Sequence, residues 1–171
     1  MKIKKLQQGF SLPELLVAIA IVGLISTITV VNFRAGQKKD VLNFAADELA
    51  SNLRGVQVSA LSGELVNGEE PRGGYGMNFV SGQNSYTYFA NADNVDYVFG
   101  EDDAEIRTYN LPQGVTLDSS NLDVVFKQPR PTIFINGAEE EIEAQIILRH
   151  EDVTETKTII INRISGRIDV N

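Results

Sequence analysis

The chain of 171 residues contains no cysteine. Without thiols the protein has no disulfide, no thiolate nucleophile and no thiolate metal site, so packing alone must hold its fold. Its single histidine, His150, lies between Arg149 and Glu151, with no nucleophile or metal ligand at helix or strand spacing. Neither the dinucleotide fingerprint nor the Walker pattern occurs. The sequence therefore predicts a surface histidine, no enzyme and no cofactor.

Basic residues are also few. The formal net charge is −8, and if residues 1–9 are removed, 12 basic residues remain against 23 acidic ones, a net charge of −11. An acidic protein of this kind is a poor match for phosphate backbones or anionic membrane surfaces, which require clustered lysine and arginine. The length allows one globular unit with an appended helix and is too short for two ordinary domains.

The strongest signal that is present is an apolar run near the amino terminus. Residues 15–31 carry no charge, and the stretch from Phe10 onward is long enough to cross roughly 30 Å of hydrocarbon as a helix. Glu14 stands near its start, and a carboxylate costs about 2.5 to 3.5 kcal/mol at the bilayer centre and less toward an interface. The leucine, isoleucine and valine residues of the run contribute about −3 to −7 kcal/mol, which offsets one carboxylate.

Two general interpretations explain this run only in part. A secretory signal would end in a small-x-small cleavage site, but Phe33 occupies a position where a small residue is needed. A plain membrane anchor requires only apolar length. That interpretation leaves Gly9, Phe10 and Glu14 unexplained.

Residues Lys4-Lys5-Leu6-Gln7-Gln8-Gly9 followed by Phe10-Ser11-Leu12-Pro13-Glu14-Leu15-Leu16 resemble the class III signal of type IV prepilins and type II secretion pseudopilins. The resemblance implies that a prepilin peptidase cuts after Gly9 on the cytoplasmic side, that Phe10 becomes N-methylated, and that the apolar segment stays on the product. It further implies a single-pass protein of the bacterial inner membrane whose globular domain lies outside the cytoplasm. Its expected partners are other pilin or pseudopilin subunits, the peptidase, the inner-membrane assembly platform and membrane lipid.

Glu14 has a specific expected role in this family. Cleavage would create an ammonium group at Phe10, with an ordinary pKa near 8, four residues from Glu14 on the same helical face. In low dielectric either charge is costly alone, so pairing the ammonium of one subunit with Glu14 of its neighbour would favour the correct axial stagger. We therefore expect Glu14 to guide assembly.

Downstream of the run, apolar residues recur at three- and four-residue steps and form one stripe of a helix. They are Leu42, Ala45, Ala46, Leu49, Leu53, Val56 and Ala60. No proline occurs between residues 14 and 62, so one helix can continue until Gly63, with a hinge near Asn32 or Gly36 as the alternative. The predicted division is a leader at 1–9, a transmembrane and filament-core helix at 10–33, an amphipathic half at 34–62 and a β-rich domain at 63–171.

Alternating residues after Gly74 predict strands. A hairpin is expected around the turn at residues 81–84, and turns are expected at Asn136-Gly137 and Ser165-Gly166. The further predicted strands are Val95–Phe99, Ile106–Leu111, Leu122–Lys127, Thr132–Ile135, Ile142–Leu148 and Thr156–Ile161, with an edge strand at Arg167–Val170. The predicted fold class is α+β, with a pilin-like long helix packed on a mostly antiparallel sheet.

Short motifs in this region resemble the narrower group of GspH/FimT-like minor pseudopilins. They are Gly74-Tyr75-Gly76, Tyr86-Thr87-Tyr88-Phe89, Leu111-Pro112-Gln113-Gly114-Val115 and Ile164-Ser165-Gly166-Arg167-Ile168. This resemblance favours a minor subunit of a type IV pilus or a type II secretion pseudopilus. The alternatives are a DNA-binding minor pilin of DNA uptake and a membrane-anchored binding module that does not polymerise.

Residue chemistry offers two further candidate sites. Asp93, Asp96 and Asp102 are candidate calcium ligands, because some relatives bind calcium in a loop, but their spacing does not follow the EF-hand pattern. Arg163 and Arg167 are candidate DNA contacts, because Gly166-Arg167 matches the start of an arginine-rich motif of DNA-binding relatives. Asp169 stands where that motif has another arginine, so the sequence predicts neither a metal site nor nucleic-acid binding.

Overall fold

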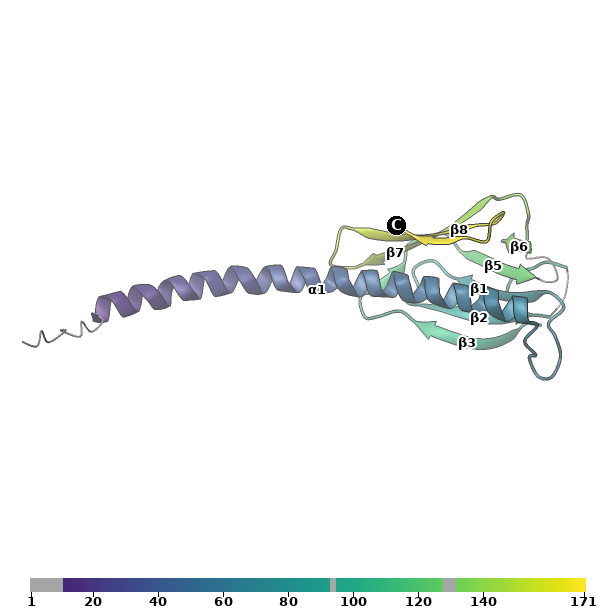
Figure 1. The fold of residues 1–171 in the computed structure, drawn as a ribbon, viewed down its shortest axis with the longest axis horizontal. Helices are drawn as coiled ribbons and strands as arrows, with labels where there is room; N and C mark the ends of the chain where they lie inside the picture. Colours follow the sequence, from purple (N-terminus) through teal and green to yellow (C-terminus); the bar gives the residue numbers. More distant parts are fainter. Residues whose placement is uncertain (1–10, 93–94, 128–131) are drawn as a thin grey trace, which may run out of the picture. The chain divides into compact units, whose positions relative to one another are not determined.

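The structure is a computed structural model that describes residues 11–92, 95–127 and 132–171, and for residues 27–35 it describes the backbone alone. The elements in chain order are α1 (Leu12–Ser62), β1 (Gly74–Phe79), β2 (Ser85–Asn91), β3 (Ala104–Asn110), β4 (Val115–Leu117), β5 (Leu122–Lys127), β6 (Thr132–Ile135), β7 (Glu143–His150), β8 (Thr156–Asn162) and β9 (Ile168–Val170) (Figure 1). The chain divides into two compact units, Met1–Gln37 and Lys38–Asn171, which are described separately below. One helix followed by antiparallel sheets confirms the predicted α+β class.

Within the second unit, α1 contributes one face to the core. All seven residues of the predicted apolar stripe are buried, and they join side chains from both sheets in one hydrophobic cluster. The helix ends at Ser62, and the next residue, Gly63, has a φ of +62°, a left-handed conformation that glycine adopts without strain. The predicted helix end near Gly63 is therefore confirmed.

The larger sheet has five strands in the order β3-β2-β1-β5-β6, and every pairing in it is antiparallel. Tyr75, Met77 and Phe79 of β1 alternate with Gly76 and Asn78 along the strand. The first three side chains belong to the cluster that includes the helical stripe, whereas Phe89 and Val125, which flank Gly76 on the neighbouring strands, form a second cluster. The predicted hairpin, formed by β1 and β2, is thus confirmed. The predicted strands Leu122–Lys127 and Thr132–Ile135 are confirmed as β5 and β6.

The second cluster is covered by a loop rather than by a strand. Residues 95–99 are not a strand, so the predicted strand Val95–Phe99 is wrong. Tyr97 instead stacks on Phe134 with ring centroids 3.7 Å apart, and Phe99 packs on Phe89 at 4.9 Å. Tyr97 has a φ of +52°, which is incompatible with a strand. Tyr97 and Phe99 alternate with other residues because both rings pack on the face of the five-stranded sheet, and not because residues 95–99 pair with an edge strand.

The smaller sheet has four strands in the order β4-β7-β8-β9, again with antiparallel pairing throughout. Its short strand β4 was not predicted, because three residues after Pro112 and Gly114 show no usable periodicity. The final strand β9 lies at the sheet edge, as predicted. Arg54 of α1 donates a hydrogen bond of 2.8 Å to the carbonyl oxygen of Ile168, which ties this edge to the helix.

Two ion pairs attach the turn between β7 and β8 to the part of α1 in the second unit. Lys38 Nζ lies 2.5 Å from Asp152 Oδ2, and Lys39 Nζ lies 2.6 Å from Glu155 Oε1. The hydrogen bond from Lys38, and then its charge, lower the pKa of Asp152. Both pairs are solvent exposed, so they orient the turn more than they stabilise the fold.

Candidate functional site

Glu14 closes the amino-terminal turn of α1. Its Oε2 accepts hydrogen bonds from the main-chain N–H of Ser11 at 3.2 Å and from the Ser11 hydroxyl at 3.0 Å. Serine before the helix and glutamate at its third position is the sequence pattern of a capping box, and Glu14 supplies one half of it here by accepting the Ser11 N–H. Gly9 and Phe10, the predicted processing residues, lie outside the described residues. The structure therefore describes one of the three predicted processing and assembly residues, Glu14.

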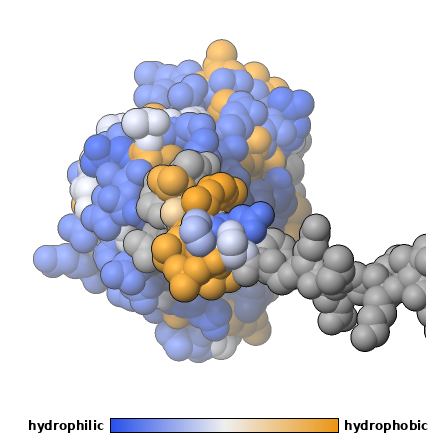
Figure 2. Space-filling view, turned by 90° about the vertical axis from the view of Figure 1, so that its left-hand side faces the viewer, coloured by the Kyte–Doolittle hydropathy of each residue, from blue (hydrophilic) through white to orange (hydrophobic). Residues whose placement is uncertain are grey.

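Apart from Glu14, the large side chains in the first turns of α1 are apolar and exposed in the single chain. Nine large hydrophobic residues between positions 12 and 25 each expose at least half of their surface. They are Leu12, Leu15, Leu16, Val17, Ile19, Ile21, Val22, Leu24 and Ile25. Exposed hydrophobic side chains appear orange in Figure 2. An apolar surface of this extent marks a contact with lipid or with another protein.

Among the described residues, no helix is both long enough and apolar enough to cross a membrane.

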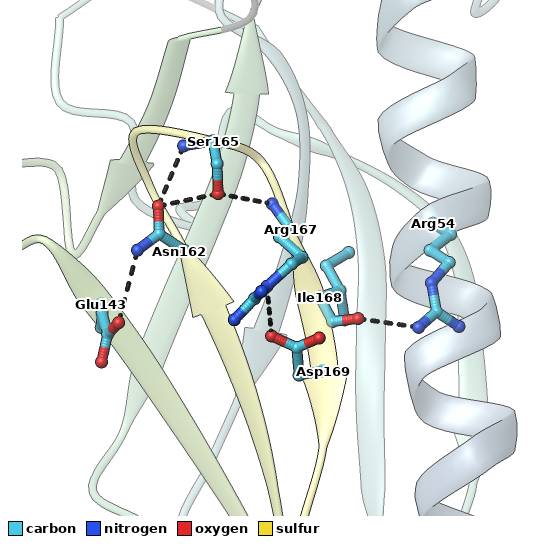
Figure 3. Close-up of polar contacts among 7 residues, drawn as sticks. All are labelled: Arg54, Glu143, Asn162, Ser165, Arg167, Ile168 and Asp169. Carbon is cyan, nitrogen blue, oxygen red and sulfur yellow. Dashed lines mark hydrogen bonds and ion pairs between the residues drawn. The ribbon is translucent and has the colours of Figure 1, made fainter.

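The two candidate DNA-contacting arginines are already engaged with acceptors of their own chain. Arg167 Nε lies 2.6 Å from Asp169 Oδ2 (Figure 3), and Arg163 Nε donates a hydrogen bond of 2.9 Å to the carbonyl oxygen of Glu141. Asp169 therefore neutralises Arg167, at the position where the motif of DNA-binding relatives has an arginine. Both arginines lie between β8 and β9, and these contacts attach them to Asp169 of β9 and to Glu141 ahead of β7.

The acidic loop between β2 and β3 uses carboxylates to bind its own main chain. Asp103 accepts hydrogen bonds from the N–H groups of Ala92 at 2.8 Å and Gly100 at 3.0 Å, and from the side chain of Asn91. Asp96 Oδ1 accepts a hydrogen bond of 3.3 Å from the main-chain N–H of Val98. Asp102 is exposed, and Asp93 lies outside the described residues. Across the part of the chain that is described, no three acidic or histidine side chains are grouped to hold a metal. Sequence reasoning missed Asp103 as the residue that organises the loop.

Asp123 on β5 is a buried carboxyl group of the second unit. It is 8 % exposed, and its Oδ1 accepts a hydrogen bond of 2.9 Å from Asn78. Burial raises the pKa of Asp123; the hydrogen bonds from Asn78 and from the main chain of Phe99 oppose this rise, and the charges of Asp103 and Asp96 add to it. Folding thus shifts the balance of this group toward its protonated form relative to an exposed carboxyl group.

The variant Asp123→Asn is expected to gain stability relative to the wild type as the pH rises. Because the folded-state pKa is raised, the stability that protonated Asp123 contributes is present below the ordinary carboxyl pKa and is lost as the pH rises through the raised value. Urea unfolding of both full-length chains, in acid and at neutral pH, measures the difference. Asp102→Asn provides a control at an exposed carboxylate. A difference that is independent of pH would contradict the assignment.

His150 is buried rather than on the surface, which corrects the prediction made from its charged neighbours. It is 6 % exposed, and its Nδ1 accepts a hydrogen bond of 3.1 Å from the main-chain N–H of Asp152. The pairing of β4 with β7 places its imidazole against Gly114, where an added Cβ would lie 2.9 Å from Nε2. His150 is buried because β4, which the sequence did not predict, pairs with β7. The charged neighbours Arg149 and Glu151 therefore led to the wrong prediction that the imidazole is exposed.

Comparison with known proteins adds one finding about the amino-terminal segment. Residues 4–30 match the family model of the prokaryotic N-terminal methylation motif. This match supports the type IV prepilin-like class and points to a structural protein rather than to an enzyme family. Comparisons with curated proteins and with solved structures give no match.

Proposed function

We propose that the chain is a structural subunit of a type IV pilus or a type II secretion pseudopilus, cut after Gly9 and assembled through α1. The observation that carries the proposal is the methylation motif at residues 4–30, joined to a helix whose first turns expose only apolar side chains and Glu14. Lipid would cover these side chains before assembly, and neighbouring helices would cover them afterwards. In this proposal residues 1–9 are the leader, 10–33 the transmembrane and filament-core helix, 34–62 the amphipathic half of the helix and 63–171 the β-rich domain.

In this function the precursor is held in the bacterial inner membrane by residues 10–33, with the globular domain outside the cytoplasm. After cleavage, Phe10 carries the methylated ammonium and Glu14 is the carboxylate that pairs with it in a neighbouring subunit. The GspH/FimT-like motifs favour a minor subunit. Its partners are other pilin or pseudopilin subunits, the prepilin peptidase, the assembly platform and lipid.

Co-expression of the full chain with a prepilin peptidase tests the processing step. The wild type is expected to lose nine residues, which electrophoresis detects, whereas Gly9→Val should remain uncut because a branched side chain replaces the small residue at the cleaved bond. Gly23→Val is the matched control, since an added Cβ there meets no atom within 4 Å. A wild-type chain that stays uncut, or a Gly9 variant that is cut as fast as the wild type, would overturn the proposal.

DNA uptake is the second function considered, and the contacts of Arg163 and Arg167 count against it. The domain of residues 36–171 is expected not to retard duplex DNA in a gel at low salt, because Arg163 and Arg167 are paired with carboxylates and the chain carries a net negative charge. Retardation that decreases steeply with salt, and is lost in the variant Arg167→Ala, would support DNA binding instead.

A further inference from the structure

The chain contains two Asn-Gly turns that have similar backbone conformations but different surroundings. Asn67 and Gly68 have φ values of +54° and +88°, and Asn136 and Gly137 have values of +49° and +76°. Left-handed angles at both central residues define the tight turn of a two-residue hairpin.

Each turn is closed by a reciprocal pair of main-chain hydrogen bonds, between Val66 and Glu69 in the first and between Ile135 and Ala138 in the second. The two sites therefore form a natural comparison within one protein.

The side chain of Asn67 is exposed and has no hydrogen bond to any described residue. A Cβ added at Gly68 would meet nothing within 4 Å, so the main chain of the turn is open to water. Neither the Asn67 side chain nor the N–H of Gly68 has a hydrogen-bond partner among the described residues. An asparagine side chain can react with the nitrogen of the residue that follows it when no such contact holds the two groups.

Asn136 is held in place although it has the same sequence and turn. Its Oδ1 accepts a hydrogen bond of 2.9 Å from the N–H of Asp123, and its own N–H donates one of 2.9 Å to the carbonyl oxygen of Asp123. Gly137 is covered by the loop that precedes β3, since an added Cβ would lie 2.2 Å from the carbonyl oxygen of Asp96. Reaction here requires these contacts to break first.

We propose that Asn67 is a site of spontaneous deamidation and isoaspartate formation, and that Asn136 is protected. The Gly68 nitrogen loses its proton to water and attacks Cγ of Asn67; a bond from this nitrogen to Cγ forms, the bond from Cγ to Nδ2 breaks, and ammonia leaves. Water then opens the resulting succinimide at either carbonyl, which yields aspartate or isoaspartate.

The product alters the loop between α1 and β1. It adds a negative charge beside Glu69 and Glu70, where like charges already lie close in sequence. Isoaspartate also adds one atom to the main chain of the turn. Because a two-residue hairpin turn requires a fixed main-chain length, we expect the reciprocal hydrogen bonds between Val66 and Glu69 to be lost.

The purified full chain, incubated in mildly alkaline buffer and digested with trypsin, provides the test. Asn67 and Asn136 are the only asparagines of the tryptic peptides 55–72 and 128–149, so mass spectrometry assigns each conversion without ambiguity. Conversion of Asn67 is expected to be faster by about tenfold, because the two hydrogen bonds between Asn136 and Asp123 must break before Asn136 reacts. Equal rates, or faster conversion of Asn136, would overturn the proposal.

Two controls separate the effect of the fold from that of the sequence. In urea the two peptides are expected to convert at similar rates, and a difference that persists in the unfolded chain would refute the structural explanation. The variant Asn67→Gln should remove the signal from peptide 55–72, because its longer side chain disfavours the five-membered ring. A signal that remains in this variant would assign the reaction to Gln57 and reject Asn67.

Discussion

Replacing Glu14 by alanine is expected to reduce incorporation of the chain into filaments by about a hundredfold or more, because removal of one partner of a buried charge pair costs about 3 to 5 kcal/mol. In the proposed assembly, the ammonium of Phe10 would enter an apolar contact with no carboxylate to receive it. Cleavage after Gly9 should continue, since Glu14 lies beyond the bond that is cut. Immunoblotting of sheared filaments against total protein measures the two effects separately.

Glu14→Gln distinguishes charge pairing from helix capping. The amide retains an oxygen that can accept the hydrogen bonds from Ser11, so this contact at the helix start is preserved while the charge is lost. If the ion pair guides assembly, this variant fails as severely as Glu14→Ala. Normal processing combined with wild-type incorporation of either variant would exclude the role proposed for Glu14.

The largest expected effect on stability comes from Gly74, at the start of β1. Its φ is +96°, and an added Cβ would lie 2.3 Å from the carbonyl oxygen of Phe126 on β5. A left-handed conformation costs an ordinary residue roughly 1 to 2 kcal/mol, and overpacking typically adds 1 to 3 kcal/mol. Gly74→Ala should therefore lower the free energy of unfolding by about 3 kcal/mol or more, as measured by urea unfolding of the full chain.

Gly82, in the turn between β1 and β2, is the matched control. Its φ of +78° is also left-handed, but an added Cβ meets nothing within 4 Å. Gly82→Ala should therefore lose only the conformational part, roughly 1 to 2 kcal/mol. Equal losses in the two variants would show that the contact with Phe126 does not limit the packing of β1 on β5.

Sequence periodicity predicted correctly those elements whose pattern of apolar residues matches the side chains that are buried. The stripe from Leu42 to Ala60 has helical spacing and is buried as a stripe, because one face of α1 meets both sheets. The ends of Leu122–Lys127 and Thr132–Ile135 were also correct, since both strands are apolar runs bounded by turn residues. These features follow from the chain's own periodicity.

Features that depend on distant partners could not be predicted. Tyr97 and Phe99 cover Phe89 and Phe134 from a loop, and their alternation imitated a strand. His150 is buried because β4 pairs with β7, and a strand of three residues is too short to be predicted from its sequence pattern. The loop role of Asp103 likewise depends on N–H groups up to eleven residues away.

The candidate site was identified from motif rather than from periodicity. Gly9, Phe10 and Glu14 were singled out by their order before the apolar run, and the match at residues 4–30 covers the same segment. The capping contact between Ser11 and Glu14 was missed, although serine followed three residues later by glutamate is its sequence signature.

The mass of the mature amino terminus, determined on protein isolated from its native host, tests the central claim most directly. If α1 is the assembly element of a processed subunit, the chain begins at a methylated Phe10 and lacks Lys2, Lys4 and Lys5. A chain that still begins at Met1 would contradict the account, because no new ammonium would exist to pair with Glu14.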